Sequence, residues 1–138
     1  MKITRRDTLL AAGGAALVAG LPLRAHAAAD EAIAEFTGGT APGEGGITLT
    51  APEIAENGNT VPIEVSAPGA AEIRVFATDN PQPGVAAFTF GPLAAEQMAA
   101  TRIRLARTQD VVAVARMTDG SFQQARQEVK VTIGGCGG

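Results

Sequence analysis

The sequence predicts an all-β protein, an antiparallel β-sandwich of short strands. From Ile47 onward, short runs rich in Val, Ile, Phe and Thr alternate with clusters of Gly, Pro, Asn and Asp. Short strands separated by turn residues at this spacing are typical of sandwiches. The chain has no Trp, no Tyr and one cysteine, so the Trp and the disulfide of antibody domains are absent. We therefore expect an immunoglobulin-like sandwich whose core consists of aliphatic side chains and phenylalanines, among them Phe76, Phe88 and Phe90.

Residues 1–27 have the pattern of an export signal. Arg5 and Arg6 form a twin-arginine motif, an apolar run follows at residues 9–21, and residues 25–27 form a small-x-small cleavage site. The apolar run is too short to span a bilayer stably. We expect a twin-arginine (Tat) signal peptide that is cleaved within two residues of Ala27, and hence a periplasmic protein. An N-terminal membrane anchor is the alternative.

Loss of this signal changes the composition of the chain. Residues 1–27 contain four of the 11 basic residues and one of the 14 acidic residues, which leaves a net charge of −6. Nucleic acids and anionic membrane surfaces are therefore not expected as partners. The only histidine, His26, is lost with the signal, so the remaining chain cannot build a Ser-His-Asp or Cys-His catalytic unit or a Cys/His metal site. We expect neither an enzyme nor a bound cofactor or metal.

Residues 28–46 are expected to form a short helix followed by a flexible linker. The helix is predicted at residues 28–36, with Ile33 and Phe36 on one side. Residues 37–46 are rich in Gly and contain a Pro, a composition that favours a connector without regular structure.

The sandwich domain is expected to span residues 47–133. Alternating patterns between turn signals predict seven strands, at residues 47–50, 61–66, 72–77, 86–90, 101–105, 111–117 and 122–133. Asp119 and Gly120 suit a two-residue hairpin turn, in which both central positions need positive φ. Residues 93–100 are expected to carry a helical turn between two strands.

Several charged residues occupy alternate positions along these strands. We interpret Glu64, Glu72 and Glu128 as solvated positions, because no pair of acidic residues has a spacing that indicates catalysis. Arg102 and Arg104 share one face of their strand. That face is either an ordinary solvated surface or a docking surface for a partner.

The last predicted strand leads into Gly134, Gly135, Cys136, Gly137 and Gly138, the C-terminal residues of the chain. Glycine has no Cβ and loses the most entropy when ordered, so we expect residues 134–138 to form a flexible swinging arm. Such an arm can present a thiol inside the narrow clefts of other proteins, which indicates a carrier with cargo attached to Cys136. One alternative is a protein-binding module with an incidental cysteine tail. Another is a thiol-disulfide protein, although a single cysteine has no resolving partner.

The sequence around Cys136 offers little to activate its thiol. An ordinary cysteine is mostly protonated at pH 7, and the C-terminal carboxylate disfavours a thiolate. No histidine and no fixed lysine is close to Cys136 in the sequence. We therefore expect partner enzymes, rather than this chain, to activate the thiol.

The terminal motif resembles the C-terminal signature of the SoxY family, the sulfur carriers of the periplasmic thiosulfate-oxidising (Sox) system. Upstream segments are similar to family positions in the same order, namely residues 52–58 and 61–62, Asn80-Pro81 with Phe88, residues 101–105 and residues 113–120. The twin-arginine signal also fits this family. The resemblance covers nearly all of the chain after the signal.

The resemblance implies a function for Cys136 as the covalent sulfur attachment site. In that family, a haem c enzyme joins the matching cysteine to thiosulfate and so forms a cysteine S-thiosulfonate. The resemblance implies that a metal-dependent thiosulfohydrolase then releases sulfate and that a sulfane dehydrogenase oxidises the sulfur that is left. The resemblance also implies a heterodimer with a separate SoxZ subunit, and no cofactor other than the bound sulfur.

Overall fold

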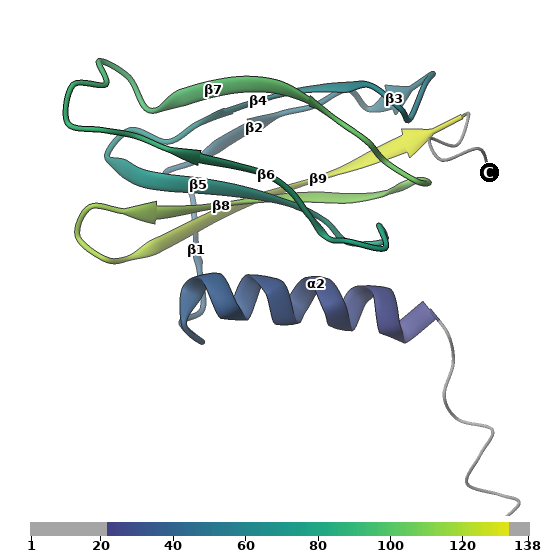
Figure 1. Ribbon diagram of the computed structural model, residues 1–138, viewed down its shortest axis with the longest axis horizontal. Helices are drawn as coiled ribbons and strands as arrows, with labels where there is room; N and C mark the ends of the chain where they lie inside the picture. The colour runs from purple at the N-terminus through teal and green to yellow at the C-terminus, as the bar shows by residue number, and fades with distance from the viewer. Residues whose placement is uncertain (1–21, 133–138) are drawn as a thin grey trace, which may run out of the picture.

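The computed structural model describes residues 22–132, which form two stacked β-sheets with one helix outside them (Figure 1). The larger sheet has the order β1-β9-β8-β5-β6, with β3 also paired to β9. Its strands are β1 (Gly43–Glu44), β3 (Ile54–Ala55), β5 (Ala70–Ala77), β6 (Gly84–Thr89), β8 (Gln109–Met117) and β9 (Phe122–Val131). The smaller sheet consists of β2 (Thr48–Thr50), β4 (Val61–Ser66) and β7 (Met98–Ile103), in the order β2-β4-β7. The predicted sandwich is confirmed.

The main core lies between the two sheets and follows the alternation of the strands. In β4, Val61, Ile63 and Val65 are buried while Pro62 and Glu64 are exposed. Burial of such a side chain contributes roughly 1.5–3 kcal/mol to stability. Of the three phenylalanines predicted for the core, Phe88 and Phe90 pack partly buried against this cluster. Phe76 is buried on the other face of the larger sheet.

The helix α2 (Pro22–Thr37) lies along the outer face of the larger sheet (Figure 1). Ala32, Ile33 and Phe36 pack against a second cluster, formed by Phe76, Val112, Val114 and Phe122. The prediction that Ile33 and Phe36 share one side is confirmed, but the helix begins at Pro22 instead of residue 28. Proline is tolerated in a first helical turn, and the following residues are rich in Ala, a strong helix former. No helix within residues 22–132 is long and apolar enough to cross a membrane.

Two short parallel strands, β1 and β3, were not expected from the sequence. β1 lies in the predicted linker and pairs with β9 through Gly43 and Gln123, while β3 pairs with β9 through Ile54 and Lys130. A Cβ on Gly43 would lie 3.2 Å from Oε1 of Gln123, so a glycine suits this close approach. Local patterns do not reveal such pairings because the partners are about 80 residues apart in the chain.

Two predicted local structures are wrong. In the hairpin between β8 and β9, Gly120 has a φ of 88°, but Asp119 does not have a positive φ. The N–H of Met117 donates to the carbonyl of Ser121 at 2.8 Å, so the loop has three residues, with the positive φ at the last one. The Ser121 hydroxyl and N–H both donate to the Asp119 carboxylate and lower its pKa.

The second wrong prediction is the helical turn at residues 93–100. Strand β7 already begins at Met98, and the residues before it form turns and bends. The side chain of Leu93 is 97% exposed, so a helix there would have no apolar surface to cover.

Glu72 is not the solvated residue that its position on a strand suggested, whereas Glu64 and Glu128 are exposed as predicted. Nε of Arg74 lies 2.9 Å from one Glu72 carboxylate oxygen, and Nη2 of Arg116 lies 3.7 Å from the other. The guanidinium of Arg74 also lies 4.5 Å from the ring centre of Phe36. This cluster therefore ties β5 and β8 to the end of α2.

We predict that Glu72→Ala lowers the free energy of unfolding by about 2 kcal/mol, because it leaves two arginines together without their shared carboxylate. Chemical denaturation followed by circular dichroism measures this change. Glu64→Ala is the control, and its exposed position predicts a change within about 0.5 kcal/mol. Equal effects of the two substitutions would show that the Glu72 cluster does not stabilise the fold.

Candidate functional site

The predicted site residues lie outside the residues that the structure describes. These are Cys136, its neighbours Gly134, Gly135, Gly137 and Gly138, and the signal residues Arg5 and Arg6. The structure does describe the strand that leads to the cysteine, β9, and the chain as far as Thr132. Cys136 is four residues beyond Thr132, so its Cα lies within about 14 Å of that residue. The surface around the end of β9 is therefore the part of the described structure that is nearest to Cys136 along the chain.

The end of β9 is held by hydrogen bonds on both edges. On one edge, the N–H of Lys130 donates to the carbonyl of Glu53 at 2.9 Å, and the N–H of Thr132 donates to that of Ala55 at 3.0 Å. On the other edge, the N–H of Val131 donates to Oγ1 of Thr108 at 2.9 Å. The backbone is thus hydrogen-bonded to its neighbours as far as Thr132, one residue beyond the end of β9.

The side chains of this strand alternate as predicted. Val129 is fully buried in the main core, whereas Glu128, Lys130 and Thr132 are exposed. Val131 is partly buried against the same core. The alternation fixes which face of the strand is turned to solvent where the chain leaves the sheet.

The loops at this end of the sandwich are joined by a buried amide pair, Asn80 and Gln109, which are 8% and 5% exposed. Nδ2 of Asn80 donates to the carbonyl of Arg104 at 2.7 Å, and its Oδ1 accepts from the N–H of Ala106 at 3.0 Å. Nε2 of Gln109 donates to the same Oδ1 at 2.8 Å and to the carbonyl of Arg107 at 3.0 Å. The pair therefore fixes the segment of residues 104–108, which we call the β7–β8 loop.

A further contact places the β7–β8 loop against the start of β4. The N–H of Leu105 donates to the carbonyl of Gly58 at 2.7 Å, and the Leu105 side chain is fully buried. Ile103 is buried as well, while Arg102 and Arg104 are exposed. Both arginines are exposed, but β7 ends at Ile103, so Arg104 belongs to the β7–β8 loop and not to the strand that was predicted to carry both.

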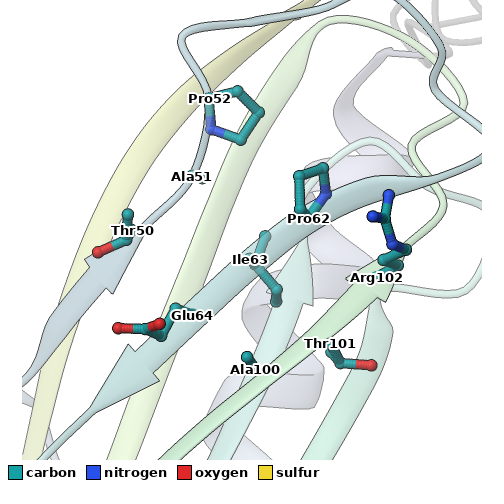
Figure 2. Close-up of a pocket in the computed structure, with 9 residues that line it drawn as sticks. All are labelled: Thr50, Ala51, Pro52, Pro62, Ile63, Glu64, Ala100, Thr101 and Arg102. Atoms are coloured by element: carbon teal, nitrogen blue, oxygen red, sulfur yellow. The ribbon is translucent and has the colours of Figure 1, made fainter.

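An open groove of about 620 Å³ lies on the outer face of the smaller sheet. Its lining residues are Thr50, Ala51, Pro52, Pro62, Ile63, Glu64, Ala100, Thr101 and Arg102. Figure 2 shows mostly small apolar side chains around it, with Glu64 and Arg102 as its charged groups. This lining includes no cysteine or histidine, and residues 22–132 contain no group of three potential metal ligands. The groove suits contact with a protein better than covalent chemistry.

Comparison with known proteins identifies the family of this chain. The family model described as sulfur oxidation protein SoxY matches residues 33–136. The chain belongs to the SoxY family. The match extends through Cys136, so the part of the chain that matches the SoxY family includes its single cysteine. None of the curated proteins compared with it matches its sequence.

Solved structures agree with this assignment. The sulfur carrier protein SoxY from Chlorobium limicola f thiosulfatophilum is 37% identical, with a TM-score of 0.68 over 78% of this chain and 94% of that chain. A superoxide reductase (neelaredoxin) from Ignicoccus hospitalis is 19% identical, with a TM-score of 0.56 over 63% and 80% of the two chains. A putative superoxide reductase from Thermotoga maritima is 18% identical, with a TM-score of 0.55 over 71% and 91%. The likeness to the two reductases is one of fold alone.

Sequence reasoning missed the residues that organise the surface around the end of β9. Asn80 and Gln109 are 29 residues apart, and Thr108 is 23 residues before Val131, so no local pattern connects them. The one available signal was the pair Asn80-Pro81, which marks a turn between strands. Nothing in the sequence indicated that the turn holds the β7–β8 loop, or that Arg107 lies near the exit of the chain.

Proposed function

We propose that this chain is a sulfur carrier of thiosulfate oxidation that binds sulfur intermediates covalently on Cys136. It acts as a substrate of other enzymes and is not itself catalytic. Its bound group is the sulfur cargo, and no separate cofactor is required. In this proposal residues 134–138 serve as a swinging arm that presents the cargo, and the sandwich is the body that the partner enzymes hold.

One observation carries the proposal: the family match runs through Cys136, which follows a strand whose end is hydrogen-bonded on both edges. A carrier needs a thiol that reaches into a partner and a body that stays fixed while it does so. The anchored end of β9 provides the fixed point at Thr132. The chain beyond it contains a single reactive side chain among four glycines.

The proposed cycle requires only nucleophilic and redox chemistry at sulfur. The Cys136 thiolate and thiosulfate form a sulfur–sulfur bond with loss of two electrons, which a haem c enzyme accepts. Water then attacks the terminal sulfonate on a thiosulfohydrolase, so that sulfate and two protons leave and a persulfide remains on the cysteine. A sulfane dehydrogenase oxidises that persulfide sulfur in turn. Throughout, the chain supplies the sulfur atom that holds the cargo.

Intact-mass and peptide mass spectrometry of protein from cells grown on thiosulfate tests this function. We expect the terminal peptide to gain either one sulfur plus one SO₃ group, the thiosulfonate, or whole sulfur atoms, the persulfides. Treatment with a reducing thiol should remove both kinds of adduct. A terminal peptide that stays unmodified during active thiosulfate oxidation would contradict the proposal.

The proposed setting is the periplasm, reached through the twin-arginine signal around Arg5 and Arg6, in a heterodimer with SoxZ. The groove of Figure 2 offers that subunit an apolar surface on the smaller sheet. The remaining partners are the haem c enzyme, the thiosulfohydrolase and the sulfane dehydrogenase. Nucleic acid and membrane are not among them, in keeping with the net negative charge of the exported chain.

A further inference from the structure

The arginines of the sandwich divide into two groups by their surroundings. Those that form ion pairs with carboxylates are Arg74, Arg116 and Arg126. Arg102, Arg104 and Arg107 are exposed and form no ion pair with any residue that the structure describes. Arg102 lies at the end of β7, and Arg104 and Arg107 lie in the β7–β8 loop. This loop is at the same end of the sandwich as the end of β9.

Arg107 lies close to the exit of the chain. It precedes Thr108, whose Oγ1 accepts the N–H of Val131 at 2.9 Å. Cys136 is five residues beyond Val131, and an arginine side chain extends several ångströms from its backbone. The charge of Arg107 is therefore within reach of the last residues of the chain.

The β7–β8 loop holds its arginines in a fixed place. The carbonyls of Arg104 and Arg107 both accept hydrogen bonds from the buried amide pair of Asn80 and Gln109. Their backbone is thus fixed while their guanidinium groups remain free to turn to solvent. An arginine on a fixed backbone loses less entropy when it binds an anion than one on a loose loop.

The opposite side of the exit carries the other sign of charge. The carbonyl of Glu53 accepts the N–H of Lys130, and the carbonyl of Glu56 accepts the hydroxyl of Thr132. Glu53, Glu128 and Lys130 line one small pocket there, so the acidic residues of this side outnumber the basic one. The chain therefore leaves between an acidic edge and a basic loop. Two partly buried acidic residues adjoin the amide pair: Asp79 precedes Asn80, and Asp110 follows Gln109 and forms an ion pair with Arg126 at 3.0 Å.

We infer that Arg104 and Arg107 form an anion site for the end of the arm, which receives the sulfonate of a thiosulfonate carried on Cys136. The inference rests on the proposed carrier function and adds a role for the carrier body. Positive charge from the β7–β8 loop favours the anionic cargo, and negative charge from Glu53 and Glu56 repels it from the other side. The loop supplies positive charge, and residues 133–138 contain no basic residue of their own.

The test measures the electrostatic potential at the Cys136 thiol with two reagents of opposite charge. Sulfonatoethyl methanethiosulfonate is anionic, and trimethylammonioethyl methanethiosulfonate is cationic. In both reactions the thiolate attacks the sulfenyl sulfur, a disulfide forms, and methanesulfinate leaves with the bonding electrons. Both reagents react with the same thiolate, so the ratio of the two rate constants does not depend on the ionised fraction of the thiol. A change in this ratio between variants therefore reports a change in the local charge.

The variants are Arg104→Gln, Arg107→Gln and the double substitution, compared with the wild type at low ionic strength. A unit charge about 10 Å from the thiol changes the local concentration of a monovalent ion about twofold. Each single variant should lower the anionic-to-cationic rate ratio about threefold to fourfold, and the double variant about tenfold. At 1 M salt, where the screening length is about 3 Å, the differences should vanish.

Arg126→Gln is the control for a distant arginine, because Arg126 lies on β9 about 20 Å before Thr132 along the strand and is ion-paired with Asp110. It should leave the ratio within about 1.5-fold of the wild type. A ratio that is unchanged in the double variant would overturn the inference and assign the arginines to a partner protein or to solvent. The carrier function is tested apart from this, since sulfur adducts in cells do not depend on the reagents.

A second measurement tests contact with the cargo. After Cys136 is labelled with the anionic reagent, the backbone amides of Arg107 and Thr108 should shift in NMR spectra relative to protein labelled with the uncharged methyl methanethiosulfonate. The shift should disappear in the Arg104→Gln, Arg107→Gln double variant. Identical spectra of the two labelled wild-type proteins would show that the sulfonate does not bind the loop.

Discussion

Cys136→Ser is expected to lose all covalent sulfur while it unfolds at the same temperature as the wild type. A serine hydroxyl is not ionised near neutral pH and forms no sulfur–sulfur bond, so neither thiosulfonate nor persulfide can form. The buried core residues of the described sandwich lie within residues 29–129, well before position 136. The two measurements are mass spectrometry of the terminal peptide and thermal unfolding followed by circular dichroism.

The control moves the thiol instead of removing it. Thr48 is exposed on β2, so the double variant Cys136→Ser, Thr48→Cys has one accessible cysteine on the body of the sandwich. We expect this protein to react with small thiol reagents but to carry no sulfur in thiosulfate-oxidising cells. Loading of the relocated cysteine would mean that the position on the arm does not matter. Full function of Cys136→Ser would favour the binding-module alternative.

Asn80→Ala is expected to cost about 3 kcal/mol of stability, the largest effect of a single polar residue in this fold. The substitution removes three hydrogen bonds of a nearly buried amide and leaves the N–H of Ala106 and the amide of Gln109 without that partner. An unsatisfied buried polar group costs about 1–3 kcal/mol. For a domain of this size the loss corresponds to a fall of roughly 10–15 °C in the melting temperature.

The same substitution should loosen the end of β9. The amide pair fixes the β7–β8 loop, and Thr108 of that loop accepts the N–H of Val131. We therefore expect the Val131 amide to exchange with solvent faster in Asn80→Ala, by more than the loss of global stability explains. Asn59→Ala, in an exposed turn, is the control and should change stability by less than about 0.5 kcal/mol. Equal effects at the two positions would refute the structural role of the amide pair.

The sandwich and its main strands were predictable because alternation is a local property. A strand with one face on the core needs apolar residues at every second position, and β4 and the end of β9 show that pattern plainly in the sequence. The unusual terminal motif is local as well, so Cys136 was identified without any structure. The family match covers residues 33–136, and the role of Cys136 stays a prediction.

The surroundings of the cysteine were not predictable, because they consist of contacts between distant parts of the chain. Glu72 looked like a solvated residue until β8 placed Arg116 beside it. The Asp119-Gly120 turn was assigned too few residues, because loop length depends on how β8 and β9 are paired.

The sequence by itself determined the fold class and the main strands and predicted Cys136 as the attachment site, since each of these depends on neighbouring residues. Only the tertiary structure decided what lies beside the end of β9. There the amide pair of Asn80 and Gln109 donates to the carbonyls of Arg104 and Arg107, and Thr108 of the same loop accepts the N–H of Val131, which comes 23 residues later in the sequence. Hydrogen bonds of this kind form only after the sandwich has brought its loops to one end.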